Sequence, residues 1–163
     1  KPDPAVMRRP PRARGERLLS WGVIARAYLF LGMLEAAAAM AAFFFVLHAA
    51  GWHHGMALDK ADPLYLQATT ACLAAIVVMQ VMNLFLCRHQ QKSALAFGLA
   101  ANPLIPFGIA AELAVILAIV YTPAGNWLFG TAPVGWETWT FALPFALLMW
   151  GLDEARKAWL RRQ

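Results

Sequence analysis

An apolar run without a charged side chain extends from about residue 68 to residue 87. Roughly 20 such residues, at a helical rise of about 1.5 Å each, match the ~30 Å hydrocarbon core of a bilayer. A segment in lipid must satisfy its backbone polar groups internally, and a helix does so. This run therefore predicts a membrane-spanning helix.

Three further apolar runs predict three further spans, over about residues 21–50, 103–122 and 138–152. Hydrophobic residues make up 61% of the 163-residue chain and charged residues only 14%, which excludes an ordinary soluble domain. We therefore expect an all-α integral membrane protein in which residues 21–163 form a four-helix transmembrane bundle. A cytoplasmic segment rich in proline and arginine is expected over residues 1–20.

The basic residues fall almost entirely on one side of the membrane in this topology. Lys60 is the exception among the 14 Lys and Arg residues. Cytoplasmic loops carry such an excess of positive charge, so both termini are predicted to be cytoplasmic. Membrane anchoring also explains the net charge of +5. The expected partner is accordingly the lipid bilayer and not nucleic acid.

Several amides and charged groups lie inside the predicted spans. Gln80 and Asn83 are three residues apart and share one helical face. Glu35 and Glu112 place carboxylates deep in the first and third spans, whereas Arg26 is near enough to the inner end to snorkel. Buried polar groups need partners and are functional candidates by default. For each carboxylate, a hydrogen bond to a neighbouring helix is the alternative to ion handling.

The segment DPAVMRRPPRARGERLLS (3–20) presents, in order, Asp3, Met7, Pro10, Pro11, Arg12, Glu16 and Leu18. This order resembles the cytoplasmic loop after the sixth transmembrane helix of type II P-type cation-transporting ATPases. Four later segments are similar to helices seven to ten of that family: AYLFLGMLEA (27–36), VVMQVMNL (77–84), PFGIAAEL (106–113) and LLMWGLDEARKAWLRR (147–162). The resemblance implies a fold like the carboxy-terminal part of the calcium-ATPase transmembrane domain.

The resemblance also implies roles for individual residues. Gln80, Asn83 and Glu112 match positions that offer ligands to a sodium site in the sodium/potassium branch. Calcium pumps of the reticulum type have a glutamate in the place of Gln80, and Asn83 replaces an acid of the sodium branch. Oxygen ligands of these kinds suit hard cations, so the expected cargo is Na⁺, K⁺ or Ca²⁺.

Residues 1–20 match a loop that contacts the phosphorylation domain in this family. Arg8, Arg9, Arg12 and Arg14 are therefore candidates for coupling that domain to the membrane. A solvated basic tail that only anchors the first helix is the alternative interpretation.

The phosphorylated Asp-Lys-Thr-Gly-Thr motif and the nucleotide domain of the family are not in this sequence, which begins KPDPAVM. We expect a piece of a longer, multi-pass plasma-membrane pump whose parent protein uses Mg²⁺ and ATP. By itself this piece is expected to hold no cofactor, to hydrolyse no ATP and to depend on the remaining helices and the phosphorylation domain. The alternative is a stand-alone four-helix membrane carrier or accessory subunit.

Overall fold

The computed structural model describes residues 19–88, 92–96 and 102–162, and these ranges contain helices and no strand. The predicted all-α class is confirmed. The elements in chain order are α1 (Trp21–Ile24), the π-helical segment η2 (Ala25–Gly32), α2 (Met33–Ala49), α3 (Pro63–Leu86), the 3₁₀ turn η3 (Ala94–Ala96), α4 (Leu104–Tyr121), α5 (Pro123–Phe129) and α6 (Trp136–Leu160).

Three helices within the described ranges are long and apolar enough to cross a membrane: Trp21–Ala49, which α1, η2 and α2 form together, then α3 and α4. They correspond to the predicted spans 21–50, 68–87 and 103–122. Helix α6 has 25 residues, which make roughly 37 Å of helix. Its apolar part, about residues 138–152, ends before Asp153, and α6 does not meet the same criterion of length and hydropathy. A fourth crossing by α6 therefore stays a prediction.

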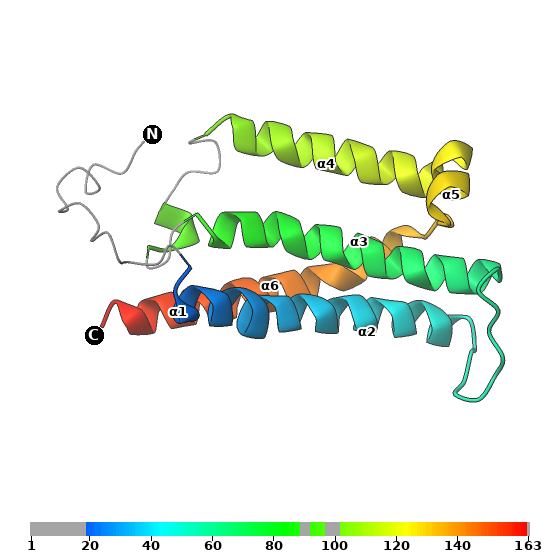
Figure 1. Ribbon diagram of the computed structural model, residues 1–163, viewed down its shortest axis with the longest axis horizontal. Coiled ribbons are helices and arrows are strands. Elements are labelled where there is room, and N and C mark those ends of the chain that lie inside the picture. Colours follow the sequence, from blue (N-terminus) through cyan, green and yellow to red (C-terminus); the bar gives the residue numbers. More distant parts are fainter. Residues whose placement is uncertain (1–18, 89–91, 97–101, 163) are drawn as a thin grey trace.

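Helix α3 occupies the centre of the arrangement (Figure 1). It packs against α2 and α6, which also pack against each other, and against α4 on its opposite side. Helix α4 in turn packs against the short α5. The outcome is a three-helix unit of α2, α3 and α6, with α4 and α5 attached to α3.

Alanines fill the contact between the three central helices. Ala42 of α2, Ala71 and Ala75 of α3, and Ala142 of α6 form one fully buried cluster. Small side chains let helix backbones approach closely, which is how helices gain packing energy inside a membrane. The Cys72 thiol of α3 then reaches the backbone of α2 and lies 3.1 Å from the carbonyl oxygen of Ala39.

We call the end of the bundle that carries α5 the outer end and the end near Leu86 and Asp153 the inner end (Figure 1). Helix α4 is held to its neighbours at the outer end. The Tyr121 hydroxyl donates to the Val134 carbonyl oxygen at 2.8 Å and accepts from Trp139 Nε1 of α6 at 2.9 Å. Val77 of α3 also joins a buried apolar cluster with Ile116 of α4 and with Val134. These contacts attach only the outer half of α4, and the inner halves of α3 and α4 diverge (Figure 1).

The turn between α4 and α5 closes tightly. Asn126 Nδ2 donates to the carbonyl oxygens of Ile119 at 3.1 Å and Val120 at 2.9 Å, two groups at the α4 terminus that have no partner within the helix. Gly125 approaches the same terminus so closely that a Cβ there would lie 2.5 Å from the Ala118 carbonyl oxygen. Gly130, in the left-handed region with φ 62°, ends α5.

Candidate cation site

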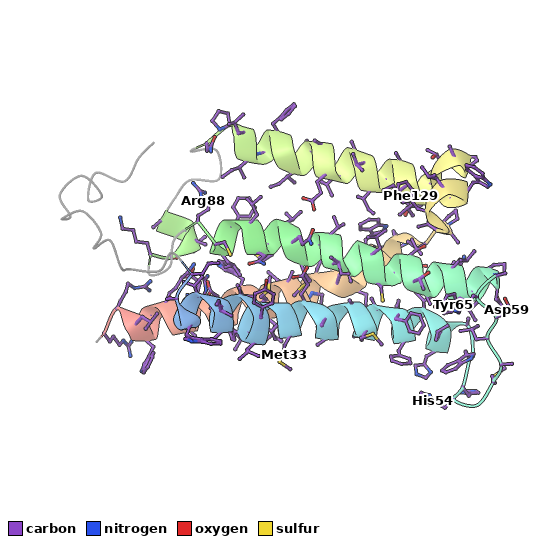
Figure 2. The ribbon with its side chains drawn as sticks, viewed as in Figure 1. Met33, His54, Asp59, Tyr65, Arg88 and Phe129 are labelled. Atoms are coloured by element: carbon purple, nitrogen blue, oxygen red, sulfur yellow. The ribbon has the colours of Figure 1, made fainter. Side chains whose placement is uncertain are left out.

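A groove lies between α3 and α4 where their inner halves diverge. Its volume is about 440 Å³, and it is lined by Gln80, Asn83, Leu84, Cys87, Arg88 and Ile105. Figure 2 shows Arg88 at the inner end of α3, beside the space that separates the two helices. The groove therefore has polar side chains along its α3 wall and extends to Arg88 at the inner end of that helix.

Two of the three predicted ligand residues, Gln80 and Asn83, line this groove together. Gln80 is exposed on the α3 surface. Asn83 is half-buried, and its Oδ1 accepts a hydrogen bond from the Cys87 thiol at 3.1 Å. The shared helical face predicted for the two amides is thus the face towards α4.

Glu112, the third predicted ligand residue, lies on the side of α4 that faces α3. Ile105, Ile109, Glu112 and Ile116 recur at intervals of four, three and four, which places them on one helical face, and each is less exposed than the residues between them. Ile105 lines the groove and Ile116 packs with Val77, so this face is the one towards α3. Glu112 is half-buried and is not itself part of the groove wall.

Gln80 and Glu112 lie at a similar depth in the bundle. Val77 and Ile116 belong to one buried cluster. Gln80 is three residues further in than Val77 on α3, and Glu112 is four residues further in than Ile116 on α4, or about 4.5 Å and 6 Å along the two antiparallel helices.

For Glu35, which is half-buried, the choice between a hydrogen bond to a neighbouring helix and ion handling stays a prediction. Glu112 makes no hydrogen bond or ion pair with another described residue. Within the described ranges no group of three or more His, Cys, Asp and Glu side chains gathers as a metal cluster. Gln80, Asn83 and Glu112 offer fewer side-chain oxygens than the about six to eight that a hard cation such as Ca²⁺ takes.

The sequence interpretation missed a buried charge cluster at the inner end of the bundle. Asp153 of α6, fully buried, lies 3.0 Å from Arg26 Nη2, 2.9 Å from Arg156 Nε and 3.0 Å from Lys157 Nζ. Burial alone would raise the pKa of the Asp153 carboxyl. The hydrogen bonds from Lys157, Arg156 and Arg26, together with the positive charge of Arg26, outweigh that effect and hold the pKa below its usual range.

The same cluster joins four elements. The Leu86 carbonyl oxygen at the end of α3 accepts from Lys157 Nζ at 3.0 Å and from Arg26 Nη2 of η2 at 3.2 Å. The Glu154 carboxylate accepts from the Ala94 N–H of η3 at 2.7 Å. Arg26 therefore pairs inside the protein where snorkelling to the surface was expected, and the fully buried Lys157 is more than a surface anchor.

One signal for this cluster was present in the sequence. Asp153 precedes Arg156 by three residues and Lys157 by four, and this spacing places opposite charges side by side on a helix.

The predicted coupling residues Arg8, Arg9, Arg12 and Arg14 lie outside the described residues.

Residues 1–159 match the model of the family described as cation transporting ATPase, C-terminus. The chain belongs to the cation-transporting ATPases. The probable cation-transporting ATPase F of Mycobacterium tuberculosis (strain ATCC 25618 / H37Rv) is 33% identical over 147 residues, which cover 89% of this chain and 15% of that protein. This agreement confirms the resemblance that the sequence motifs predicted.

Relatives among animal cation-transporting ATPases align over nearly the whole chain. The sodium/potassium-transporting ATPase subunit alpha-2 of Gallus gallus is 28% identical over 182 residues, covering 96% of this chain and 18% of the relative. The potassium-transporting ATPase alpha chain 2 of Oryctolagus cuniculus is 25% identical over 186 residues, covering 99% and 17%. The chain spans less than a fifth of the length of these relatives, and it corresponds to the carboxy-terminal membrane region of a type II P-type cation-transporting ATPase.

Proposed function

We propose that this region supplies the helix scaffold and part of the cation path of an ATP-driven pump. In this proposal Gln80, Asn83 and Glu112 contribute oxygen ligands to a transported Na⁺, K⁺ or Ca²⁺. The observation that supports it best is the groove between α3 and α4: two of these residues line it, and Glu112 lies on the helical face turned towards it.

The chemistry of the polar groups fits a hard cation. Amide carbonyl and carboxylate oxygens are hard ligands, whereas thiolate and imidazole clusters select softer metals. The remaining ligands of the cation would come from helices upstream in the parent protein. The parent protein would also bind Mg²⁺ and ATP. A conformational change that brings these helices closer or further apart would alter cation affinity, and the cation in turn would favour the conformation that coordinates it best.

The arrangement of basic residues supports a cytoplasmic location for the inner end of the bundle. Arg26 and Lys157 both donate to the Leu86 carbonyl oxygen at the end of α3, and Arg88 lies at the same end of that helix (Figure 2). We propose that both termini are cytoplasmic, that residues 21–163 form the membrane domain, and that the membrane is the plasma membrane. Residues 1–20 would then extend towards the phosphorylation domain, with the arginines at 8, 9, 12 and 14 as the coupling contacts.

The test is the substitution Glu112→Ala in the full-length pump, with the cation concentration for half-maximal ATPase activation as the measurement. Loss of one ligand should raise this concentration by about tenfold, which corresponds to ~1.4 kcal/mol of binding free energy. Leu113→Ala is the control, because Leu113 is exposed beside Glu112 on the same helix. Unchanged cation activation in the Glu112 variant would assign Glu112 a structural role and refute the proposal.

A further inference from the structure

A pocket of about 250 Å³ lies at the outer end of the bundle. The end of α2 and the beginnings of α3 and α6 enclose it, and it shares no lining residue with the groove between α3 and α4. Its walls combine apolar side chains, among them Phe45 and Leu64, with the polar side chains of Gln67, Glu137 and Thr138. We propose that this pocket binds a primary ammonium group that carries a short apolar chain. The inference goes beyond the proposed function and does not depend on the cation path.

The Thr138 hydroxyl group is an unpaired polar group on an otherwise buried residue. Thr138 is only 3% exposed, and its side chain makes no hydrogen bond with another described residue. Among the described residues, however, no fully buried side-chain oxygen lacks a partner. The hydroxyl oxygen therefore keeps its access to the pocket that Thr138 lines. A ligand there would give this hydroxyl group the partner that buried polar groups normally have.

Gln67 offers its amide oxygen, because its amide nitrogen already has a partner. Its Nε2 donates to the Pro133 carbonyl oxygen at 3.2 Å. The two ends of a glutamine side chain differ, since the NH₂ group donates hydrogen bonds and the oxygen accepts them. The oxygen has no partner among the described residues. It is therefore available to a ligand in the pocket that Gln67 lines.

The Glu137 carboxylate adds a negative charge beside the pocket. Its carbon and both its oxygens occupy the space where a Cβ on Gly135 would lie, and Gly135 itself lines the pocket. The backbone does not require glycine at this position, because φ −71° and ψ 164° are ordinary values that other residues adopt. The missing side chain therefore makes room for the carboxylate, which has no hydrogen bond or ion pair with another described residue.

These three groups match the chemistry of a primary ammonium. Each of them can accept a hydrogen bond, and a primary ammonium has three N–H groups to donate and a positive charge that the carboxylate attracts. The attached chain would lie against Phe45 and Leu64. A volume of about 250 Å³ is below the ~300–1,000 Å³ of most ligand pockets, so the part of the ligand inside is small. Two sources carry such a group, the ethanolamine headgroup of a phospholipid and a free alkylamine.

Calorimetric titration of n-butylammonium into the full-length pump, held in phosphatidylcholine nanodiscs, tests the site. We expect Glu137→Gln and Gly135→Ala each to raise the dissociation constant by about tenfold, the low end for a hydrogen bond to a charged group, because Glu137 is exposed. Gly135→Ala keeps the carboxylate and only displaces it, so the two variants separate its position from its charge. Both variants should fold, because Glu137 is exposed and the backbone at position 135 accommodates alanine.

The control variant is Gly151→Ala, which adds a methyl group to the same helix at a place where it meets nothing. The control ligand is n-butyltrimethylammonium, which keeps the charge and the chain but has no N–H group, and it should bind about tenfold more weakly or worse. No binding of n-butylammonium, unchanged affinity in either test variant, or equal affinity for the trimethyl compound would overturn the proposal.

Nanodiscs that also contain phosphatidylethanolamine distinguish the two sources. Competition between this lipid and n-butylammonium would support the lipid headgroup as the occupant, and an unchanged affinity for n-butylammonium would support a free amine. Competition that is as strong in Glu137→Gln as in the unmodified pump would overturn the proposal, because the lipid would then act from another site.

Discussion

Asp153→Asn is predicted to destabilise the inner end of the bundle strongly, because it removes one negative charge from a site with three cations. The side chains of Asp153 and Lys157 are both 0% exposed, with 3.0 Å between Oδ2 and Nζ. Asparagine has nearly the same size, so the loss of charge dominates and no cavity forms. Breaking a buried ion pair by removing one partner costs about 3–5 kcal/mol, since the other charge stays buried without compensation.

Thermal unfolding of the full-length pump in detergent, followed by tryptophan fluorescence, measures this cost. At about 2–4 °C per kcal/mol for a unit of this size, the unfolding midpoint of the membrane region should fall by roughly 6–20 °C. Glu137→Gln is the control, because it makes the same change from acid to amide at an exposed position of α6. A midpoint as high as that of the control would refute the reasoning.

A second substitution separates charge from packing. Asp153→Asn combined with Lys157→Met removes both buried charges and should recover most of the lost stability, since uncharged replacements of buried pairs are often neutral. Arg26 and Arg156 keep side-chain exposures of 14% and 25%, so their charges still reach solvent. A double variant no more stable than Asp153→Asn alone would contradict the electrostatic account.

Two further predictions concern stability. Because the pKa of Asp153 is lowered from its ordinary value of 3.8, its stabilising effect is fully present above that value and is lost as the pH falls through the folded-state pKa. As the pH falls below 3.8, the unmodified pump should therefore lose more stability than Asp153→Asn, and equal losses would contradict this. Gly125→Ala should cost about 1–3 kcal/mol in the same thermal assay, because its Cβ would lie 2.5 Å from the Ala118 carbonyl oxygen. Gly108→Ala, where a Cβ meets nothing, is the control, and an unchanged midpoint for Gly125→Ala would show that the turn between α4 and α5 adapts.

Apolar run length was enough to predict the long helices but neither their ends nor the short α5. Helix α3 begins at Pro63, five residues before the predicted span, because Asp62 caps it by accepting from the Leu64 N–H at 2.8 Å. Helix α6 continues to Leu160, beyond the apolar run, because Asp153 and Lys157 find partners there. Local signals for both extensions, an Asp-Pro pair and oppositely charged residues four apart, were present in the sequence.

The contacts between helices could not be predicted in the same way. The contact of the Cys72 thiol of α3 with the Ala39 carbonyl oxygen of α2 depends on the register between the two helices. That register is set by the packing of alanines such as Ala42 and Ala75, and helical periodicity within one segment does not determine it. The contact of Lys157 with the Leu86 carbonyl oxygen depends in the same way on where α3 ends.

The most direct test of the account is whether position 80 faces a cation path inside the pump. In a full-length pump without other cysteines, Gln80→Cys should react with a small water-soluble thiol reagent, and a saturating concentration of the transported cation should slow that reaction. Leu113→Cys, at an exposed apolar position of α4, should react with a lipid-soluble reagent and show no protection by the cation. A cysteine at position 80 that reacts only with the lipid-soluble reagent, at a rate indifferent to the cation, would contradict the account.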